Sequence, residues 1–134
     1  MSWDVLIQDF GDFKQISDIP NDFQPKSIGN KYDIIAKIKE TFPDIKISDS
    51  SWLTLENEIC SIEFNIGHEE NVDSIMFHVR GEESETINEL LDLLESMNVR
   101  AVDTSTGEFI ENKQNIKKGL MQWKKFRDSI LKRK

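Results

Sequence analysis

Two segments in the middle of the chain alternate between apolar and polar residues, and this pattern constrains the fold more than any other feature. In residues 60–66 every second residue is apolar, and residues 72–80 repeat the pattern after a polar stretch at 67–71. A period of two predicts strands with one buried and one exposed face. The short connection predicts an antiparallel hairpin. The expected core residues of this hairpin are Ile62, Phe64, Ile75 and Phe77.

Apolar residues spaced three and four apart predict three helices. These helices cover about residues 31–41, 85–98 and 115–131. Asn30 is the expected N-cap of the first helix, because its side chain can accept a hydrogen bond from a free backbone amide. Pro43 should end the same helix, since the residue before a proline is pushed out of the helical region.

Shorter apolar stretches predict further strands at residues 3–10, 52–55 and 99–102. Residues 14–29 contain two prolines and few regular patterns, and we expect an ordered loop anchored by apolar residues such as Phe23. The resulting order is β-α-β-β-β-α-β-α. It predicts the α+β class, with a mainly antiparallel sheet and helices packed on one of its faces.

The length of 134 residues and the 37% of hydrophobic residues predict a single domain over residues 1–134. The start of the chain lacks the basic and apolar regions of a signal peptide, and no apolar run is long enough to span a membrane. The single cysteine, Cys60, forms no internal disulfide, which is typical of a reducing compartment. We therefore expect a cytoplasmic protein. No phosphate-binding loop, dinucleotide fingerprint or zinc pattern occurs, so we expect no cofactor.

Charge is divided unevenly along the chain. Residues 112–134 hold nine of the 17 basic residues and one of the 25 acidic residues, a net charge of +8, whereas the remainder carries −16. We interpret residues 112–134 as a basic amphipathic C-terminal helix that packs on the acidic body of its own chain. A nucleic-acid-binding helix is the alternative, although a body with this charge repels phosphates at distances up to about 10 Å.

The polar face of the predicted hairpin is the candidate contact surface. Glu63, Asn65, His78 and Arg80 lie on this face, and cross-strand neighbours about 5 Å apart permit a Glu–His or a Glu–Arg contact. Cross-strand ion pairs on an exposed sheet are one interpretation. The alternative is a small enzyme in which Glu63 orients His78 as a general base. No serine or cysteine in the chain has the sequence context of an activated nucleophile.

The polar stretch between the two strands and the start of the second strand add three acidic residues to the candidate surface. They are Glu69, Glu70 and Asp73. A metal site needs several ligands at fixed spacings, and His68 with these carboxylates does not form such a pattern. We therefore expect no bound metal here and treat the carboxylates as residues that contact a partner.

Three stretches resemble a group of small uncharacterised bacterial proteins. They are residues 61–67 (SIEFNIG), 72–81 (VDSIMFHVRG) and 101–109 (AVDTSTGEF), and the N-terminal Ser-Trp-Asp at residues 2–4 fits the same group. The resemblance covers about residues 2–111 and leaves the basic helix outside. These proteins are similar in layout to small α+β immunity proteins encoded beside bacterial toxins. The resemblance implies a non-enzymatic protein that neutralises a toxin by direct contact, its acidic face covering the toxin's active site.

Overall fold

The computed structural model describes residues 2–81 and 85–132. The helices in this part of the chain are the 3₁₀ helix η1 (Ile16–Asp18) and the α-helices α1 (Lys31–Thr41), α2 (Glu85–Met97) and α3 (Lys113–Lys132). The strands are β1 (Trp3–Gln8), β2 (Gly29–Asn30), β3 (Lys46–Asp49), β4 (Trp52–Glu56), β5 (Cys60–Asn65), β6 (Asn71–Val72), β7 (Ile75–Gly81), β8 (Arg100–Asp103) and β9 (Glu108–Phe109).

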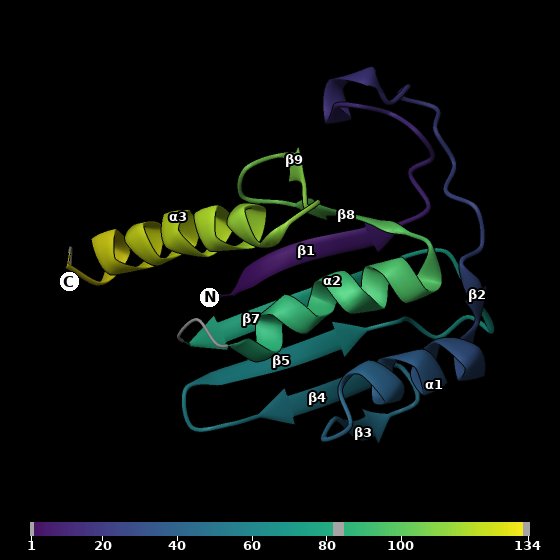
Figure 1. The fold of residues 1–134 in the computed structure, drawn as a ribbon, viewed down its shortest axis with the longest axis horizontal. Coiled ribbons are helices and arrows are strands. Elements are labelled where there is room, and N and C mark those ends of the chain that lie inside the picture. The colour runs from purple at the N-terminus through teal and green to yellow at the C-terminus, as the bar shows by residue number, and fades with distance from the viewer. Residues whose placement is uncertain (1, 82–84, 133–134) are drawn as a thin grey trace.

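Seven of these strands form one antiparallel sheet in the order β3-β4-β5-β7-β1-β8-β9 (Figure 1). The hairpin of β5 and β7 lies at its centre, and Glu63 is directly opposite His78 in the register. The N-terminal strand β1 inserts between β7 and β8, so that Asp4 becomes the second cross-strand neighbour of His78. The sheet thereby brings together residues that are more than seventy positions apart.

All three α-helices contribute to a core on one face of the sheet (Figure 1). The predicted hairpin core is confirmed, since Ile62, Phe64, Ile75 and Phe77 are fully buried. Glu63, which alternates with these residues, lies on the opposite face. The predicted α+β class, with a mainly antiparallel sheet and helices packed on one face, is therefore confirmed. The N-cap is confirmed as well, because the side chain of Asn30 accepts a hydrogen bond from the Tyr32 amide at 2.9 Å.

A smaller apolar cluster lies on the opposite face of the sheet, at the end formed by β1, β8 and β9. Phe10, Val102 and Phe109 are buried there. Apolar side chains of the long loop between β1 and β2 pack against them, namely Ile16, Ile19 and Phe23. The loop is thus anchored, as the sequence predicts, and it covers one end of this face only.

The predicted hairpin differs from the structure at its second strand, which begins at Ile75 and not at residue 72. Val72 belongs to β6 and pairs with Gly29 of β2 in a separate two-stranded ladder. The chain turns there because the Glu70 carbonyl accepts a hydrogen bond from the Lys31 amide at the start of α1. The edge strand β3 was not expected, since all four of its residues are exposed and no alternating pattern marks it.

Candidate functional site

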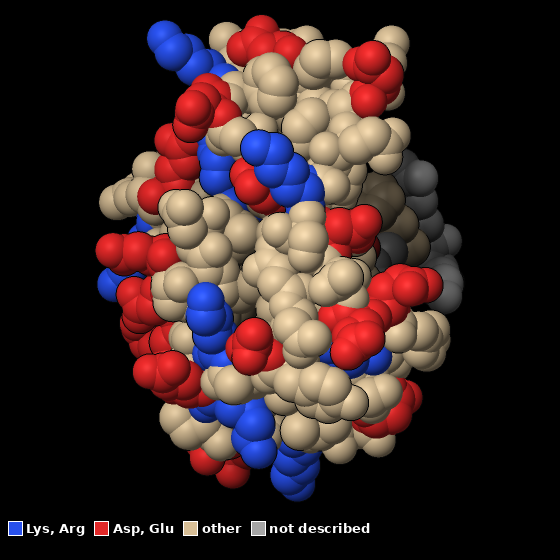
Figure 2. Space-filling view, turned by 90° about the vertical axis from the view of Figure 1, so that its right-hand side faces the viewer, with Lys and Arg blue, Asp and Glu red and all other residues tan. Residues whose placement is uncertain are grey.

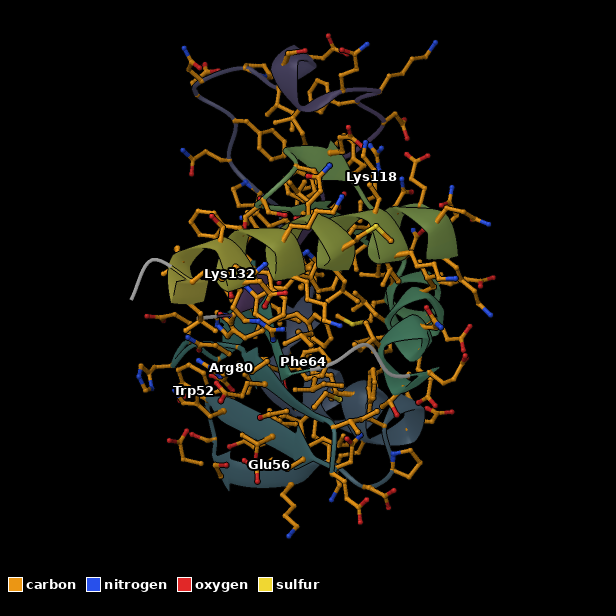
Figure 3. All side chains as sticks on the ribbon, turned by 90° about the vertical axis from the view of Figure 1, so that its left-hand side faces the viewer. Trp52, Glu56, Phe64, Arg80, Lys118 and Lys132 are labelled. Carbon is orange, nitrogen blue, oxygen red and sulfur yellow. The ribbon has the colours of Figure 1, made fainter. Side chains whose placement is uncertain are left out.

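Part of the second sheet face remains uncovered by any other element of the described chain. We call it the open sheet face, and its residues come from β1, β4, β5 and β7: Asp4, Trp52, Thr54, Glu63, Asn65, Met76, His78 and Arg80. In Figure 3, Trp52 and Arg80 lie on the side of the sheet away from α1 and α2. The alternation of β4, β5 and β7 places these side chains outward, because Leu53, Phe64 and Phe77 occupy the core side.

The charged residues of the open sheet face pair with one another. The imidazole Nδ1 of His78 lies 2.7 Å from Oδ1 of Asp4, and Arg80 Nη1 donates to Glu63 Oε1 at 2.7 Å. Glu63 and His78 are opposite in the register, yet each binds a different partner. The structure therefore forms the Glu–Arg contact, and Asp4 takes the place expected for Glu63 beside the histidine. Both carboxylates of the open sheet face, Asp4 and Glu63, are thus engaged by a side chain of β7.

Trp52 is the largest side chain on the open sheet face. Its ring stacks on the imidazole of His78, with ring centroids 6.1 Å apart and planes inclined by 22°. Trp52 is also the register partner of Asn65, which in turn pairs with Met76 on β7. All four side chains are partly exposed, so the face offers an aromatic and apolar centre flanked by polar groups.

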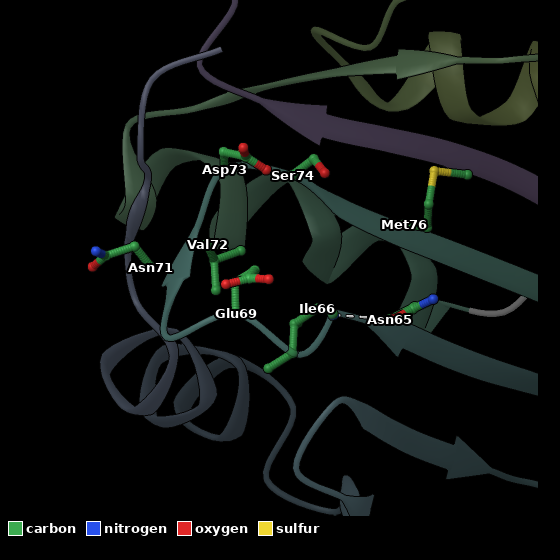
Figure 4. A pocket seen from close by; sticks show the side chains of 9 residues that line it. Asn65, Ile66, Glu69, Asn71, Val72, Asp73, Ser74 and Met76 are labelled. Carbon is green, nitrogen blue, oxygen red and sulfur yellow. Dashed lines mark hydrogen bonds between the residues drawn. The ribbon is translucent and has the colours of Figure 1, made fainter. Parts of the chain in front are cut away.

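The predicted loop carboxylates lie at one end of this face. Glu69 and Asp73 line a shallow pocket of about 190 Å³, together with Asn65 and Met76 (Figure 4). Glu70 does not line it; its backbone carbonyl is bound to Lys31. Among the residues that the structure describes, no cluster of His, Cys, Asp and Glu is suited to hold a metal ion. The pocket therefore extends the open sheet face and gives that end an acidic border.

Sequence reasoning missed Trp52 and Asp4 as members of this surface. Trp52 begins an alternating stretch, so its face follows from the pattern once the register is known. The position of Asp4 has no such signal. It depends on the pairing of β1 with β7, which joins distant parts of the chain.

The turn before Trp52 is fixed by a side-chain hydrogen bond. Oδ1 of Asp49 accepts from the hydroxyl of the buried Ser51 at 2.6 Å and from its amide at 2.7 Å. The hydroxyl is the main cause that holds the pKa of Asp49 below its ordinary value, and the amide adds to it. The same contacts link β3 to β4 and set the start of the strand that carries Trp52.

Replacing Ser51 by alanine should raise the pKa of Asp49 toward its ordinary value, because the hydroxyl that favours the carboxylate is lost. A lowered folded-state pKa stabilises the fold above the ordinary pKa, and this contribution disappears as the pH falls through the folded value. The variant should lose the part of this dependence of stability on acidic pH that the hydroxyl provides, while the part due to the Ser51 amide remains. An NMR titration of the Asp49 carboxyl carbon measures the change. Ser50→Ala, in the same turn, should leave the titration unaltered, and an unchanged curve for Ser51→Ala contradicts the assignment.

The basic C-terminal helix packs on its own chain over its first half. Ile116, Leu120 and Trp123 of α3 are buried in the main core, and Lys118 pairs with Glu108 at 3.1 Å. Elsewhere on the body, acidic and basic side chains are interspersed with uncharged ones, as the face in Figure 2 shows. The negative charge of the body is thus not gathered into one patch on that face.

The fold and this surface define an α+β protein with a one-sided antiparallel sheet whose second face is partly open. The chain matches no protein-family model, and neither curated proteins nor solved structures provide a match to it. Within the described residues, no helix has the length and apolar character needed to cross a membrane.

Proposed function

We propose that this chain is a non-enzymatic binding protein that contacts a protein partner through the open sheet face. The observation that carries the proposal is the partly exposed Trp52, stacked on His78 on a sheet face that no described element covers. Tryptophan is enriched among the residues that dominate binding energy. An apolar centre with polar surroundings is also the usual anatomy of a protein–protein interface.

The two side-chain contacts of the face support binding over a role in folding alone. Asp4 holds His78, and Glu63 holds Arg80, so both side chains are already ordered before a partner arrives. Ordering side chains on association costs about 0.5–1.5 kcal/mol each, and this cost is reduced for groups held in advance. The sheet beneath them is rigid, because its other side is the main core.

We further propose that the partner is a bacterial toxin and that the chain acts as its immunity protein. The resemblance of residues 2–111 to small proteins of that layout supports this identification of the partner. Glu69 and Asp73, which line the pocket at the end of the open sheet face, complement a partner whose contact surface is basic. Neutralisation would follow from covering the toxin's active site, with no chemical step by this chain.

Trp52→Ala should weaken the complex by about 2 kcal/mol, a loss of about 30-fold in affinity, since the ring is the largest apolar group on the face. Isothermal titration with the purified product of the adjacent gene measures the effect. Tyr32→Ala is the matched control, because this aromatic residue is 70% exposed on α1, away from the open sheet face. The absence of any complex at micromolar concentration would overturn the proposal, as would equal losses for the two variants.

A small enzyme that uses His78 is the second candidate, favoured by the hydrogen bond between His78 and Asp4. A carboxylate at Nδ1 orients an imidazole so that Nε2 acts as a base, as in catalytic triads. His78→Asn separates the two functions: a hydrolytic activity lost in this variant supports the enzyme. A wild type without hydrolytic activity, whose partner binding is weakened by His78→Asn, supports the binding protein.

A further inference from the structure

The shallow pocket of about 190 Å³ at the end of the open sheet face shares two residues with that face, Asn65 and Met76. Asn65 is the register neighbour of both Trp52 and Met76, so the pocket begins beside the aromatic centre of the face. Figure 4 shows Asp73 and Asn65 on opposite sides of the pocket. A partner surface that covers Trp52 therefore also reaches the pocket.

The segment that forms the pocket, residues 67–74, is held in place on two sides. Oδ1 of Asn65 accepts a hydrogen bond from the Gly67 amide at 3.1 Å, and the Glu70 carbonyl accepts one from the Lys31 amide at 2.8 Å. The pocket is thus formed before a partner binds. A group that enters it does not have to order the segment first, and this reduces the cost of association.

The two carboxylates of the pocket, Glu69 and Asp73, form no ion pair with a basic side chain in the described part of the chain. The carboxylates of the open sheet face, Asp4 and Glu63, are by contrast engaged by side chains of β7. A partner that closes over Glu69 and Asp73 removes water from them, which is unfavourable unless it supplies positive charge and hydrogen-bond donors. The pocket therefore selects a cationic group.

We propose that an arginine side chain of the partner enters this pocket and binds Glu69 and Asp73, an inference that rests on the proposed binding function of the open sheet face. A guanidinium has five N–H donors in a fixed planar arrangement, so it can donate to two carboxylates at once. Its aliphatic stem packs against Met76, an apolar side chain of the pocket. Lysine fits less well, because its ammonium is more strongly hydrated and lysine is depleted in interfaces, where arginine is enriched.

A small probe tests the pocket without the partner. N-acetyl-arginine amide, whose only charge is the guanidinium, should shift the backbone amide signals of residues 65–76 in NMR spectra of the full chain. The shifts should saturate with a dissociation constant in the millimolar range, as for a weak exposed pair. N-acetyl-citrulline amide has the same shape without the charge and should give no saturable shift.

Substitutions place the probe in the pocket. Asp73→Asn should weaken the arginine probe by at least about threefold, since one of its two carboxylates is lost. Glu70→Gln is the matched control, because it removes the same charge from a neighbouring residue that does not line the pocket. It should change the affinity by less than about 1.5-fold. Both residues are exposed, so the remaining NMR signals should report an unaltered fold.

The complex shows whether the partner uses the pocket. With the purified product of the adjacent gene, Glu69→Gln and Asp73→Asn should each weaken binding by about tenfold or more, because each leaves part of a covered guanidinium unpaired. Glu70→Gln should weaken it by less than about threefold, as for a charge at the border of an interface. Isothermal titration measures all three changes.

The two experiments separate failure of this inference from failure of the proposed function. A complex that forms but responds equally to Asp73→Asn and Glu70→Gln overturns the inference and leaves the binding function standing. An arginine probe that binds no better than the citrulline probe also overturns the inference. If no complex forms, the proposed function fails, and the arginine probe alone decides whether the pocket is a guanidinium site.

Discussion

Replacing Phe64 by alanine should destabilise the fold by about 3–5 kcal/mol, the range for removing a buried aromatic side chain. Phe64 is fully buried on β5, and its ring centroid lies 4.9 Å from that of Phe77 and 5.5 Å from that of Phe42. The ring thus joins the centre of the sheet to the end of α1, and its loss leaves a cavity between two layers. Urea unfolding followed by circular dichroism measures the change.

Glu63→Ala provides the control, because Glu63 is the neighbouring residue of the same strand and points to the open sheet face. It loses one ion pair with the half-exposed Arg80, which is worth about 0–1 kcal/mol. Phe64→Leu, which keeps part of the apolar volume, should cost about half as much as Phe64→Ala and remains measurable if the alanine variant does not fold. Equal losses for Phe64→Ala and Glu63→Ala would contradict the assignment of the two faces.

Gly119→Val should destabilise the protein by about 3 kcal/mol, because no side chain fits where α3 crosses the sheet. A Cβ atom at Gly119 would lie 1.9 Å from Oδ2 of Asp103 and 3.0 Å from Nε1 of Trp3. Neither group can move easily. Asp103 is buried and its other oxygen accepts two hydrogen bonds from Ser105, while Trp3 is fully buried. Thermal unfolding gives the loss, and a red shift of tryptophan emission reports exposure of the buried Trp3 and Trp123.

The cause of this loss can be separated from helix propensity. Ser129→Val, at an exposed position of the same helix, should change the free energy of unfolding by less than about 0.5 kcal/mol. Replacing Asp103 by alanine removes the carboxylate that a side chain at residue 119 would meet, so it should restore part of the lost stability. In the double variant Gly119→Val/Asp103→Ala, the total loss should therefore be at least about 1 kcal/mol smaller than the sum of the two single losses. If the losses of the two single variants simply add, the clash between the side chain at residue 119 and Asp103 is not the cause of the destabilisation.

The strongest sequence patterns predicted the parts of the fold that depend on local periodicity. The bounds of α1 agree with the prediction, and β5, β7, α2 and α3 agree to within a few residues. These elements carry their pattern within themselves, because the same residues that form the element also form its buried face. The small strands β2, β3, β6 and β9 were missed or only partly seen, since two to four residues carry no measurable period.

For the candidate site, the sequence placed Glu63, Asn65, His78 and Arg80 correctly on one face. The sequence permitted Glu63 to pair with either His78 or Arg80, and no feature of the sequence distinguished between these two contacts. The choice depends on β1, which enters the sheet beside β7 and presents Asp4 to His78. The carboxylate of Asp4 is hydrogen-bonded to Nδ1 of His78, and Glu63 pairs with Arg80 instead.

By itself, the order of residues determined the fold class, the buried side of the central hairpin and the amphipathic character of the last helix. Each of these follows from the alternation or the spacing of apolar residues along a short segment. Only the tertiary structure decided which part of the second sheet face stays open, which charges pair on it and where α3 leaves the body. These features depend on contacts between distant segments, such as the loop over β8 and the crossing at Gly119. Such contacts depend on the packing of the whole core, and the periodicity of a short segment does not predict them.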